Sequence, residues 1–399
     1  MALLSIDEAT ARIQALAVPL EPETSALSHA AGRVLAADVA CDRDQPPFDR
    51  AMMDGFAVSS ADGVGPLRVV GIVPAGGAYD AVVAGGEAVR IMTGAPVPAG
   101  TDAVQMFENT TWDDDHVTLT APVRPGENVA RRGSELREGA VAVPSGARLT
   151  SARLGLLWSV GAATVQVVRA PRLAILSTGD ELVELADRPG PSQIRDSNRG
   201  VIGDLCRRAG AEVVLERRVA DDPSATRSAI ADALDQVDVL VLTGGVSAGD
   251  FDVVGQCLRA EGVEVVFHKV DIRPGKPLWF GHRGAQLVFG LPGNPVSSAV
   301  VARVFLVPAL RRLAGAQRPH DPRVLLPLRA PFRGTGDRPT YQPAIAELGV
   351  GVTLLRTGGS GDLPGFASAN ALAILPARHP DFDAGSDIEV MIDAEALLG

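Results

Sequence analysis

The sequence contains few cysteines and histidines, and this argues against the sites that depend on them. Its three cysteines, Cys41, Cys206 and Cys257, show no CxxC spacing and have no adjacent histidine. A disulfide framework and a structural zinc site are therefore not expected. The six histidines are scattered along the chain, so a His-ligated metal is not supported either.

Long hydrophobic runs and an excess of positive charge are also missing. No stretch of about 18 apolar residues occurs, and the first residues lack a charged leader followed by an apolar run. We therefore expect a cytoplasmic protein that is neither exported nor inserted in a membrane. The formal net charge is −11, so no global field attracts nucleic acid or an acidic membrane surface. An anionic ligand must be held by local cations or by a metal.

The length and texture of the chain predict several domains. A chain of 399 residues with 46% hydrophobic residues is too long for one core. Ser5 to about Ala37 and Ser151 to Val160 are predicted to be helical. We expect a discontinuous helical linking domain (1–41 and 138–170), a small β-rich insertion (42–137), an α/β domain (171–316) and a C-terminal β domain (317–399).

The central segment is predicted to be a doubly wound α/β domain. Its apolar runs 173–176, 213–215, 239–242 and 287–289 are nearly continuous, as expected of parallel strands that are covered on both faces. Ser197 or Asn198 is expected to open one helix. Asn294 and Pro295 suit the cap and the first position of another.

Three glycine turns follow these strands, and ligands of open α/β sheets bind at this edge. Each turn taken alone is typical of ordinary chain reversal. Three turns at one edge instead favour a phosphate or pyrophosphate held by main-chain N–H groups and a helix N-terminus. The turn residues that we expect to bind it are Thr178, Gly179, Asp180, Thr243, Gly244, Gly245, Ser247, Gly249, Asp250, Pro292, Gly293, Asn294 and Pro295.

Acidic and basic side chains lie near the same edge. Glu181, Asp221 and Asp252 are candidate ligands of Mg²⁺, because an anionic phosphate beside carboxylates needs a bridging cation. The alternative is that such residues are solvated loop charges or helix caps. Lys269, Arg273 and the Lys276 turn form a predicted cationic hairpin, and the alternative there is a basic surface.

Together these segments resemble the MoeA family, the molybdopterin molybdenumtransferases that include the E domain of gephyrin. The matching segments run in family order along almost the whole chain: 47–57, 92–98, 177–182, 243–252, 269–277 and 290–295. The resemblance implies a molybdopterin-binding α/β domain. It also implies an enzyme that inserts molybdate into adenylylated molybdopterin with Mg²⁺-dependent hydrolysis, and releases molybdenum cofactor and AMP.

The resemblance further implies a homodimer in which the β insertion of one subunit completes the site of the other. Transient contacts with a MogA-like adenylyltransferase and with molybdoenzymes are implied as well. Residues at functional family positions are Asp54, Glu135, Glu181, Asp221, Asp252, Lys269, Arg273 and Ser360. Asp54 and Glu135 would come from the partner subunit.

Three positions depart from the family pattern. Glu135 stands where relatives usually have Asp, and Arg273 stands where they usually have Lys. Pro343 lies where relatives commonly place an Arg, so that anion contact is lost or is taken over by Arg338. Two other functions stay open: a nicotinamide-nucleotide amidase-like enzyme on the same α/β domain, and a non-catalytic scaffold.

Overall fold

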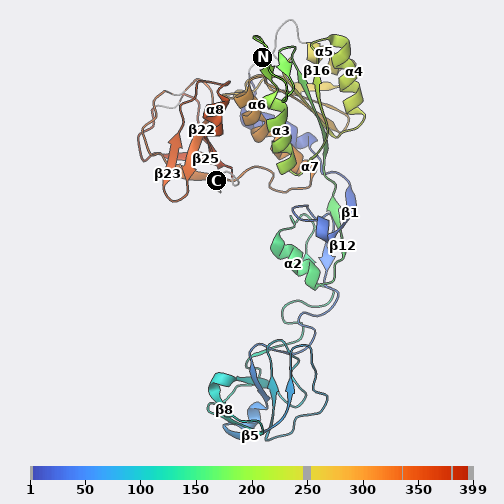
Figure 1. Ribbon diagram of the computed structural model, residues 1–399, viewed down its shortest axis with the longest axis vertical. Helices are drawn as coiled ribbons and strands as arrows, with labels where there is room; N and C mark the ends of the chain where they lie inside the picture. Colours follow the sequence, from blue (N-terminus) through green and yellow to red (C-terminus); the bar gives the residue numbers. More distant parts are fainter. Residues whose placement is uncertain (1–2, 246–252, 335, 379–380, 394–399) are drawn as a thin grey trace.

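The computed structural model describes residues 3–245, 253–334, 336–378 and 381–393. The chain is elongated and forms four units, which Figure 1 shows as an α/β unit with a β unit beside it, a middle unit below and an inserted β unit at the far end. None of the helices in these described ranges has the length and apolar character that crossing a membrane requires. The domain boundaries expected from the sequence stay predictions.

The α/β unit contains a six-stranded sheet in the order β16-β13-β17-β20-β19-β18. Strands β16, β13, β17 and β20 pair in parallel, whereas β19 pairs antiparallel with both β20 and β18. The strand bounds are β13 (Arg172–Thr178), β16 (Glu212–Val219), β17 (Val239–Thr243), β18 (Glu264–Phe267), β19 (Trp279–Arg283) and β20 (Gln286–Leu291). The predicted α/β fold is confirmed. Strands β13 and β17 are buried on both faces, which explains their apolar runs.

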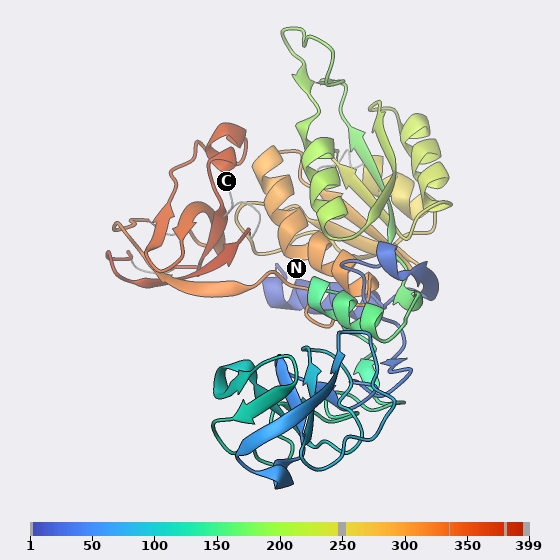
Figure 2. The ribbon, with the colours of Figure 1, turned by 60° about the horizontal axis from the view of Figure 1, so that its bottom comes forward.

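Helices cover both faces of this sheet. One face packs against α1 (Ile6–Leu16), α3 (Ser197–Arg208) and a continuous helical run made of α6 (Pro295–Val301), the π-helical segment η4 (Ala302–Leu306) and α7 (Val307–Leu313). The other face packs against α4 (Pro223–Leu234) and α5 (Val253–Ala260). Figure 2 also shows an arm, between β14 (Leu182–Val183) and β15 (Ile194–Arg195), that projects from the carboxyl edge.

Helix α1 starts where the sequence predicts and ends much earlier. Ser5 and Glu8 form the expected capping box. The helix stops at Leu16 rather than near Ala37, because prolines follow at positions 19 and 22 and the chain then extends into a strand. Ile13 of this helix is buried in the core of the α/β unit.

The middle unit is built from two chain segments that flank the insertion. Its elements are β1 (Pro22–Ala26), η1 (Leu27–His29), β2 (Val39–Ala40), β11 (Val141–Val143), α2 (Ser151–Ser159) and β12 (Thr164–Val168). Strand β1 pairs with β12, and β2 pairs with β11. The helix predicted after Ser151 is confirmed, with Thr150 as its cap. Strands therefore replace much of the predicted helical character of this region.

The inserted unit is a β structure, as predicted. Its six-stranded sheet has the order β7-β4-β6-β5-β9-β8 and buries side chains on both faces. The elements are β3 (Arg50–Ala51), β4 (Gly55–Val58), η2 (Ser60–Asp62), β5 (Gly65–Val73), β6 (Glu87–Ile91), β7 (Ala103–Met106), η3 (Phe107–Asn109), β8 (Thr110–Trp112), β9 (His116–Leu119) and β10 (Val129–Ala130). Strands β3 and β10 form a separate pair at its base.

The C-terminal unit is a five-stranded sheet that docks on the α/β unit. Its elements are β21 (Arg323–Pro327), β22 (Thr340–Glu347), β23 (Gly351–Leu354), α8 (Leu363–Ala367), β24 (Ala371–Leu375) and β25 (Asp387–Ile392), with sheet order β21-β25-β24-β22-β23. Tyr341, Leu372 and Met391 belong to the same buried core as α6 and α7. Shared apolar burial therefore holds the two units side by side.

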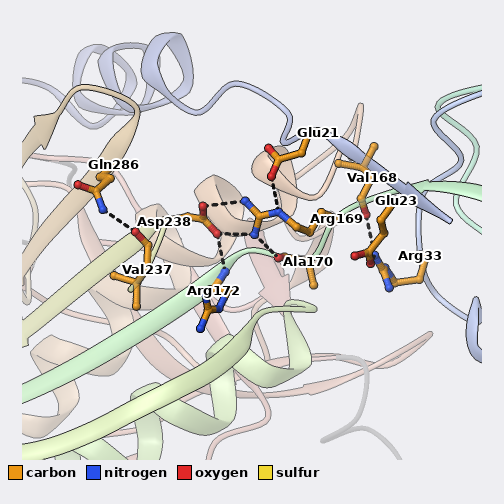
Figure 3. A network of polar contacts seen from close by, with 10 residues as sticks. All are labelled: Glu21, Glu23, Arg33, Val168, Arg169, Ala170, Arg172, Val237, Asp238 and Gln286. Atoms are coloured by element: carbon orange, nitrogen blue, oxygen red, sulfur yellow. Dashed lines mark hydrogen bonds and ion pairs between the residues drawn. The ribbon is translucent and has the colours of Figure 1, made fainter. Parts of the chain in front are cut away.

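An ion-pair network joins the middle unit to the amino ends of the central strands (Figure 3). Both Nη atoms of Arg169 donate to the carboxylate of Asp238 at 2.8 Å, and its Nε donates to Glu21 Oε1 at 2.7 Å. The Arg172 N–H also donates to Asp238, at 2.7 Å. Burial raises the pKa of Asp238, but the Arg169 and Arg172 hydrogen bonds outweigh it and the net pKa lies below its ordinary value.

We expect Asp238→Asn to lower the free energy of unfolding by about 1.5–3 kcal/mol at pH 7, because it removes a charge that accepts three hydrogen bonds. Since the folded pKa of Asp238 is depressed, its contribution is full above the unfolded pKa and disappears as pH falls through the folded pKa. The stability difference between wild type and variant should therefore shrink in acid. Urea denaturation at several pH values measures it.

The matched control is Asp235→Asn, because the Asp235 side chain is 78% exposed and its Arg283 partner lies at 3.4 Å. That change should alter stability by less than about 0.5 kcal/mol. An equal loss in both variants would contradict a specific role of the Arg169–Asp238 pair.

Candidate active site

The strand register brings three turns together at the carboxyl edge of the α/β sheet. Ser177 at the end of β13 lies opposite Thr243 of β17, and Thr243 lies opposite Leu291 of β20. The turns that follow these strands therefore begin at the same level. Figure 1 shows this edge at the end of the α/β unit away from the middle unit.

The turns are packed so closely that side chains have no room between them. A Cβ on Gly244 would lie 2.3 Å from the Thr178 carbonyl oxygen, and one on Gly245 would lie 2.7 Å from Thr178 Oγ1. Both glycines also have positive φ, +83° and +63°. Gly293 of the third turn approaches Gly244, since its Cβ would lie 3.7 Å from the Gly244 Cα. The result is a surface of exposed main chain that an oxyanion can approach.

Asn198 connects these turns, and the sequence did not identify it as a site residue. Its Nδ2 donates to Thr243 Oγ1 at 2.9 Å and to the Gly293 carbonyl at 2.8 Å. The predicted cap at Ser197 or Asn198 is wrong, because Asp196 accepts from the Arg199 N–H and caps α3. The sequence did contain a clue in the polar run Asp196-Ser197-Asn198. If Asp196 caps the helix, Asn198 lies inside the first turn and its amide can donate hydrogen bonds to other segments.

A polar atom without a partner marks the same place. Thr178 is 4% exposed, and its Oγ1 makes no hydrogen bond within the described residues. A buried hydroxyl without a partner costs free energy unless a ligand or water satisfies it. Its position beside Gly245 is consistent with a ligand at the glycine turns.

The predicted acidic residues lie at the ends of the neighbouring strands β13 and β16. Asp180 Oδ1 accepts from the Asp221 N–H at 3.2 Å, and the Glu181 carboxylate folds back over Gly179. Asp222 caps α4, which was one of the two roles considered for the acidic residues here. Ser247, Gly249, Asp250 and Asp252 lie outside the described residues. Within the described ranges, this edge included, no group of three His, Cys, Asp or Glu is placed to hold a metal.

The predicted cationic segment is the connection between the antiparallel strands β18 and β19. Its ends are closed by a hydrogen bond from the Val270 N–H to the Lys276 carbonyl, at 3.0 Å. Gly275, with φ +108°, packs onto α6, since its Cβ would lie 2.1 Å from Val301 Cγ2. The Arg273 and Lys276 side chains are exposed, and Lys269 is half-buried. The segment is therefore fixed against the helix that follows the third glycine turn.

The C-terminal unit contributes to the same region. Asn294 occupies the cap position of α6 but makes no capping hydrogen bond, and its Nδ2 instead donates to Ser360 Oγ at 2.8 Å. The Arg273 N–H donates to the Pro339 carbonyl at 2.8 Å, and Arg338 Nη1 donates to the Ile272 carbonyl at 3.3 Å. Pro343 is buried in β22. Arg338 thus contacts the cationic segment, and Ser360 contacts the start of α6 after the third glycine turn.

Both lysines of the chain lie in the cationic segment, and the motif analysis above did not consider this distribution. Lys269 and Lys276 are the only two lysines among 37 basic residues, and the other 35 are arginines. An ammonium is a compact point charge, whereas a guanidinium is a planar fork. All the remaining basic positions are arginine, so the compact cation occurs in this segment alone.

Two predicted site residues lie far from this edge. Asp54 Oδ1 accepts from the backbone N–H and from Oγ1 of Thr93, at 2.7 and 2.8 Å, and these two bonds lower the pKa of Asp54. Glu135 pairs with Arg50 at 2.9 Å. Both belong to the inserted unit and its base, and Figure 1 shows that unit beyond the middle unit, on the side away from the α/β unit. A single chain does not bring them to the site.

Comparisons with known proteins agree with this architecture. Residues 4–161 match the MoeA N-terminal region (domain I and II), residues 174–312 match a "Probable molybdopterin binding domain", and residues 326–392 match the MoeA C-terminal region (domain IV). A molybdopterin molybdenumtransferase of Staphylococcus aureus is 32% identical over 98% of this chain and 95% of its own length. A Nostoc protein with the same name is 35% identical over 90% of this chain and 86% of its own.

Solved structures of the molybdopterin biosynthesis MoeA protein from Pyrococcus horikoshii have the same fold. One has a TM-score of 0.82 at 30% identity and covers 98% of this chain and 99% of its own. A second has a TM-score of 0.85 at 27% identity and covers 98% and 100%. From its three matched regions and its nearly full-length relatives, the chain belongs to the MoeA family.

Proposed function

We propose that this protein is a molybdopterin molybdenumtransferase, which inserts molybdate into adenylylated molybdopterin and hydrolyses the anhydride to release molybdenum cofactor and AMP. The observation that carries the proposal is the convergence of three glycine turns, the cationic segment and Ser360 at one edge of the α/β sheet. Relatives over 98% of the chain carry the same name. All three cysteines are buried, with Cys41 and Cys206 as free thiols, and this agrees with a cytoplasmic location.

We assign separate tasks to the two halves of the site. The glycine turns present main chain to the pyrophosphate of the substrate, and Asn198 holds two of the turns in register. Lys269, Arg273, Lys276 and Ser360 collect molybdate beside the dithiolene sulfurs. Because the cationic segment packs on α6, the two anionic groups are held at a defined separation.

Magnesium fits the acidic part of the site by its donor chemistry. Glu181 and Asp221 follow the neighbouring strands β13 and β16, and carboxylate oxygens are the ligands that Mg²⁺ prefers. We propose that these residues and Asp252 would hold the ion. When bound, Mg²⁺ would neutralise negative charge on the pyrophosphate. Asp180 positions the Asp221 backbone through its hydrogen bond.

We propose a homodimer, because Asp54 and Glu135 lie at the far end of the chain from the glycine turns. The partner's insertion would then supply both carboxylates to the site. The contacts with Thr93 and Arg50 hold these side chains in place before the subunits meet. Contacts with an adenylyltransferase that delivers the substrate belong to this proposal as well.

Replacing Lys276 tests the molybdate half of the site. We expect Lys276→Gln to raise the molybdate concentration for half-maximal AMP release by at least about tenfold, which corresponds to roughly 1.4 kcal/mol. Lys276→Arg keeps the charge but changes its shape, so it should leave that concentration at least about threefold above wild type. Arg259→Gln, an exposed change on α5, is the control. Equal effects in all three variants would contradict a local role.

Replacing Asn198 tests the register of the turns. In Asn198→Asp a carboxylate would face Thr243 Oγ1 and the Gly293 carbonyl, which now accept from the amide. We expect kcat to fall by about 10- to 100-fold while the molybdate dependence stays unchanged, since the cationic segment is untouched. Ser197→Ala, the preceding residue on α3, should keep wild-type kinetics. A change only in molybdate dependence would argue against this role.

Mixing inactive subunits tests the shared site. At a molybdate concentration far below the one that half-saturates Lys276→Gln, this variant and Asp54→Asn should each be strongly impaired alone. If Asp54 of one subunit acts with Lys276 of the other, a mixed dimer has one site with both wild-type residues and one site with both substitutions. Random exchange should then restore about a quarter of wild-type AMP release. A mixture as inactive as either parent would show that both residues serve the same subunit's site.

A further inference from the structure

We infer that the chain has a second anion site, a cavity at the end of the α/β unit opposite the glycine turns, which binds a compact oxyanion of the linear triphosphate type. The cavity has a volume of about 940 Å³ and lies where the middle unit, the α/β unit, the linker after α7 and the end of β25 meet. Seven arginines and two aspartates line it. This is an unusual concentration of positive charge in a chain of net charge −11.

The cavity is separate from the proposed active site. Helix α3 carries Asn198 in its first turn and ends with Arg208 at the cavity, about 15 Å further along at roughly 1.5 Å per residue. The run from α6 to α7 likewise begins at the third glycine turn and ends at the cavity. A ligand that fills one place cannot touch the other.

Four of the arginines already have carboxylate partners. Arg303 and Arg311 donate to Asp321 at 2.9 and 2.6 Å, and Arg208 pairs with Asp204 at 2.9 Å. Arg33 pairs with Glu23 at 2.5 Å. Arg303 also lies 3.9 Å from a carboxylate oxygen of Asp393, so four carboxylates balance these four arginines without a ligand. Arg208 and Arg311 also stand in the last turns of α3 and α7, where cations offset the helix dipole.

The other three arginines have no carboxylate partner within the described residues. Arg148 donates to the Gly32 carbonyl at 3.2 Å, and Arg153 donates to the Arg148 carbonyl at 2.7 Å. Arg318 lies exposed in the linker after α7. None of the three lies in a helix's last turn, so helix ends do not account for them. Three uncompensated guanidinium groups around one cavity favour an oxyanion with several charges, which guanidinium forks bind in pairs of hydrogen bonds.

The lining also limits the shape of the ligand. His320 is the only aromatic side chain among the described lining residues. A nucleotide base would therefore find little surface on which to stack. The negative charge that the cavity binds is therefore that of a phosphate chain, either inorganic or part of a nucleotide. Because arginines from the middle unit and the linker surround it, such a ligand would also hold the middle unit, and with it the insertion, against the α/β unit.

The test measures binding of inorganic tripolyphosphate by calorimetry and by thermal unfolding of the full chain. We expect saturable binding and a higher melting temperature, because a ligand of the folded state stabilises it by mass action. The double variant Arg148→Gln/Arg318→Gln should weaken binding by at least about tenfold. ATP should bind no more tightly than tripolyphosphate, and adenosine should not bind. Both arginines are exposed, so the unliganded variant should melt as wild type does.

Two further variants separate binding in the cavity from a general charge effect and from binding at the cationic segment. Arg12→Gln/Arg259→Gln carries the same charge change on exposed helix positions outside the cavity and should bind as wild type does. Lys276→Gln should also keep tripolyphosphate binding. Binding that survives in the cavity variant, or that is lost in Lys276→Gln or in the charge control, would overturn the inference. The cavity variant should retain AMP release, so this outcome is independent of the proposed function.

Discussion

The site depends on one constraint, the common level at which the parallel strands β13, β17 and β20 end. Their register sets Ser177, Thr243 and Leu291 side by side, so the turns that follow must share the same space. Only glycine permits this at Gly244 and Gly245, where added side chains would collide with Thr178. Asn198 then ties the second turn to the third through its amide. Main chain is therefore exposed at Gly244 and Gly245, where no larger side chain fits.

The elongated shape follows from where the units are attached. The middle unit joins the α/β unit at the amino ends of the strands, through the Arg169–Asp238 pair, whereas ligands bind at the carboxyl ends. The insertion continues from the middle unit in the same direction, away from the site (Figure 1). In the proposed function, carboxylates of the insertion would therefore act on the site from a second subunit. The attachment point of the middle unit makes the dimer a requirement of the proposed chemistry.

Local signals predicted the strands well and the contacts between units poorly. Continuous apolar runs located β13, β17 and β20, and the capping box located the start of α1. The predicted helix to Ala37 failed because prolines and pairing with β12 favour a strand there. Asn294 was predicted as a cap from local propensity, but its amide is used by Ser360, a residue 66 positions away. Asn198 was missed for the same reason, since its partners are distant in the sequence and only the fold brings them together.

The two kinds of cation in this chain serve different physical purposes. Arginine forms the fixed pairs. The fork of Arg169 donates two parallel bonds to Asp238, and Arg303 donates one bond to Asp321. Such a pair is useful when the geometry never has to change. The two lysines both lie in the segment that packs on α6. A tetrahedral oxyanion that must arrive, react and leave as part of a larger product suits a compact ammonium better, since its three hydrogens can follow the moving oxygens. Under the proposed function, lysine at these two positions suits the substrate, whereas the arginines that pair with carboxylates suit the fold.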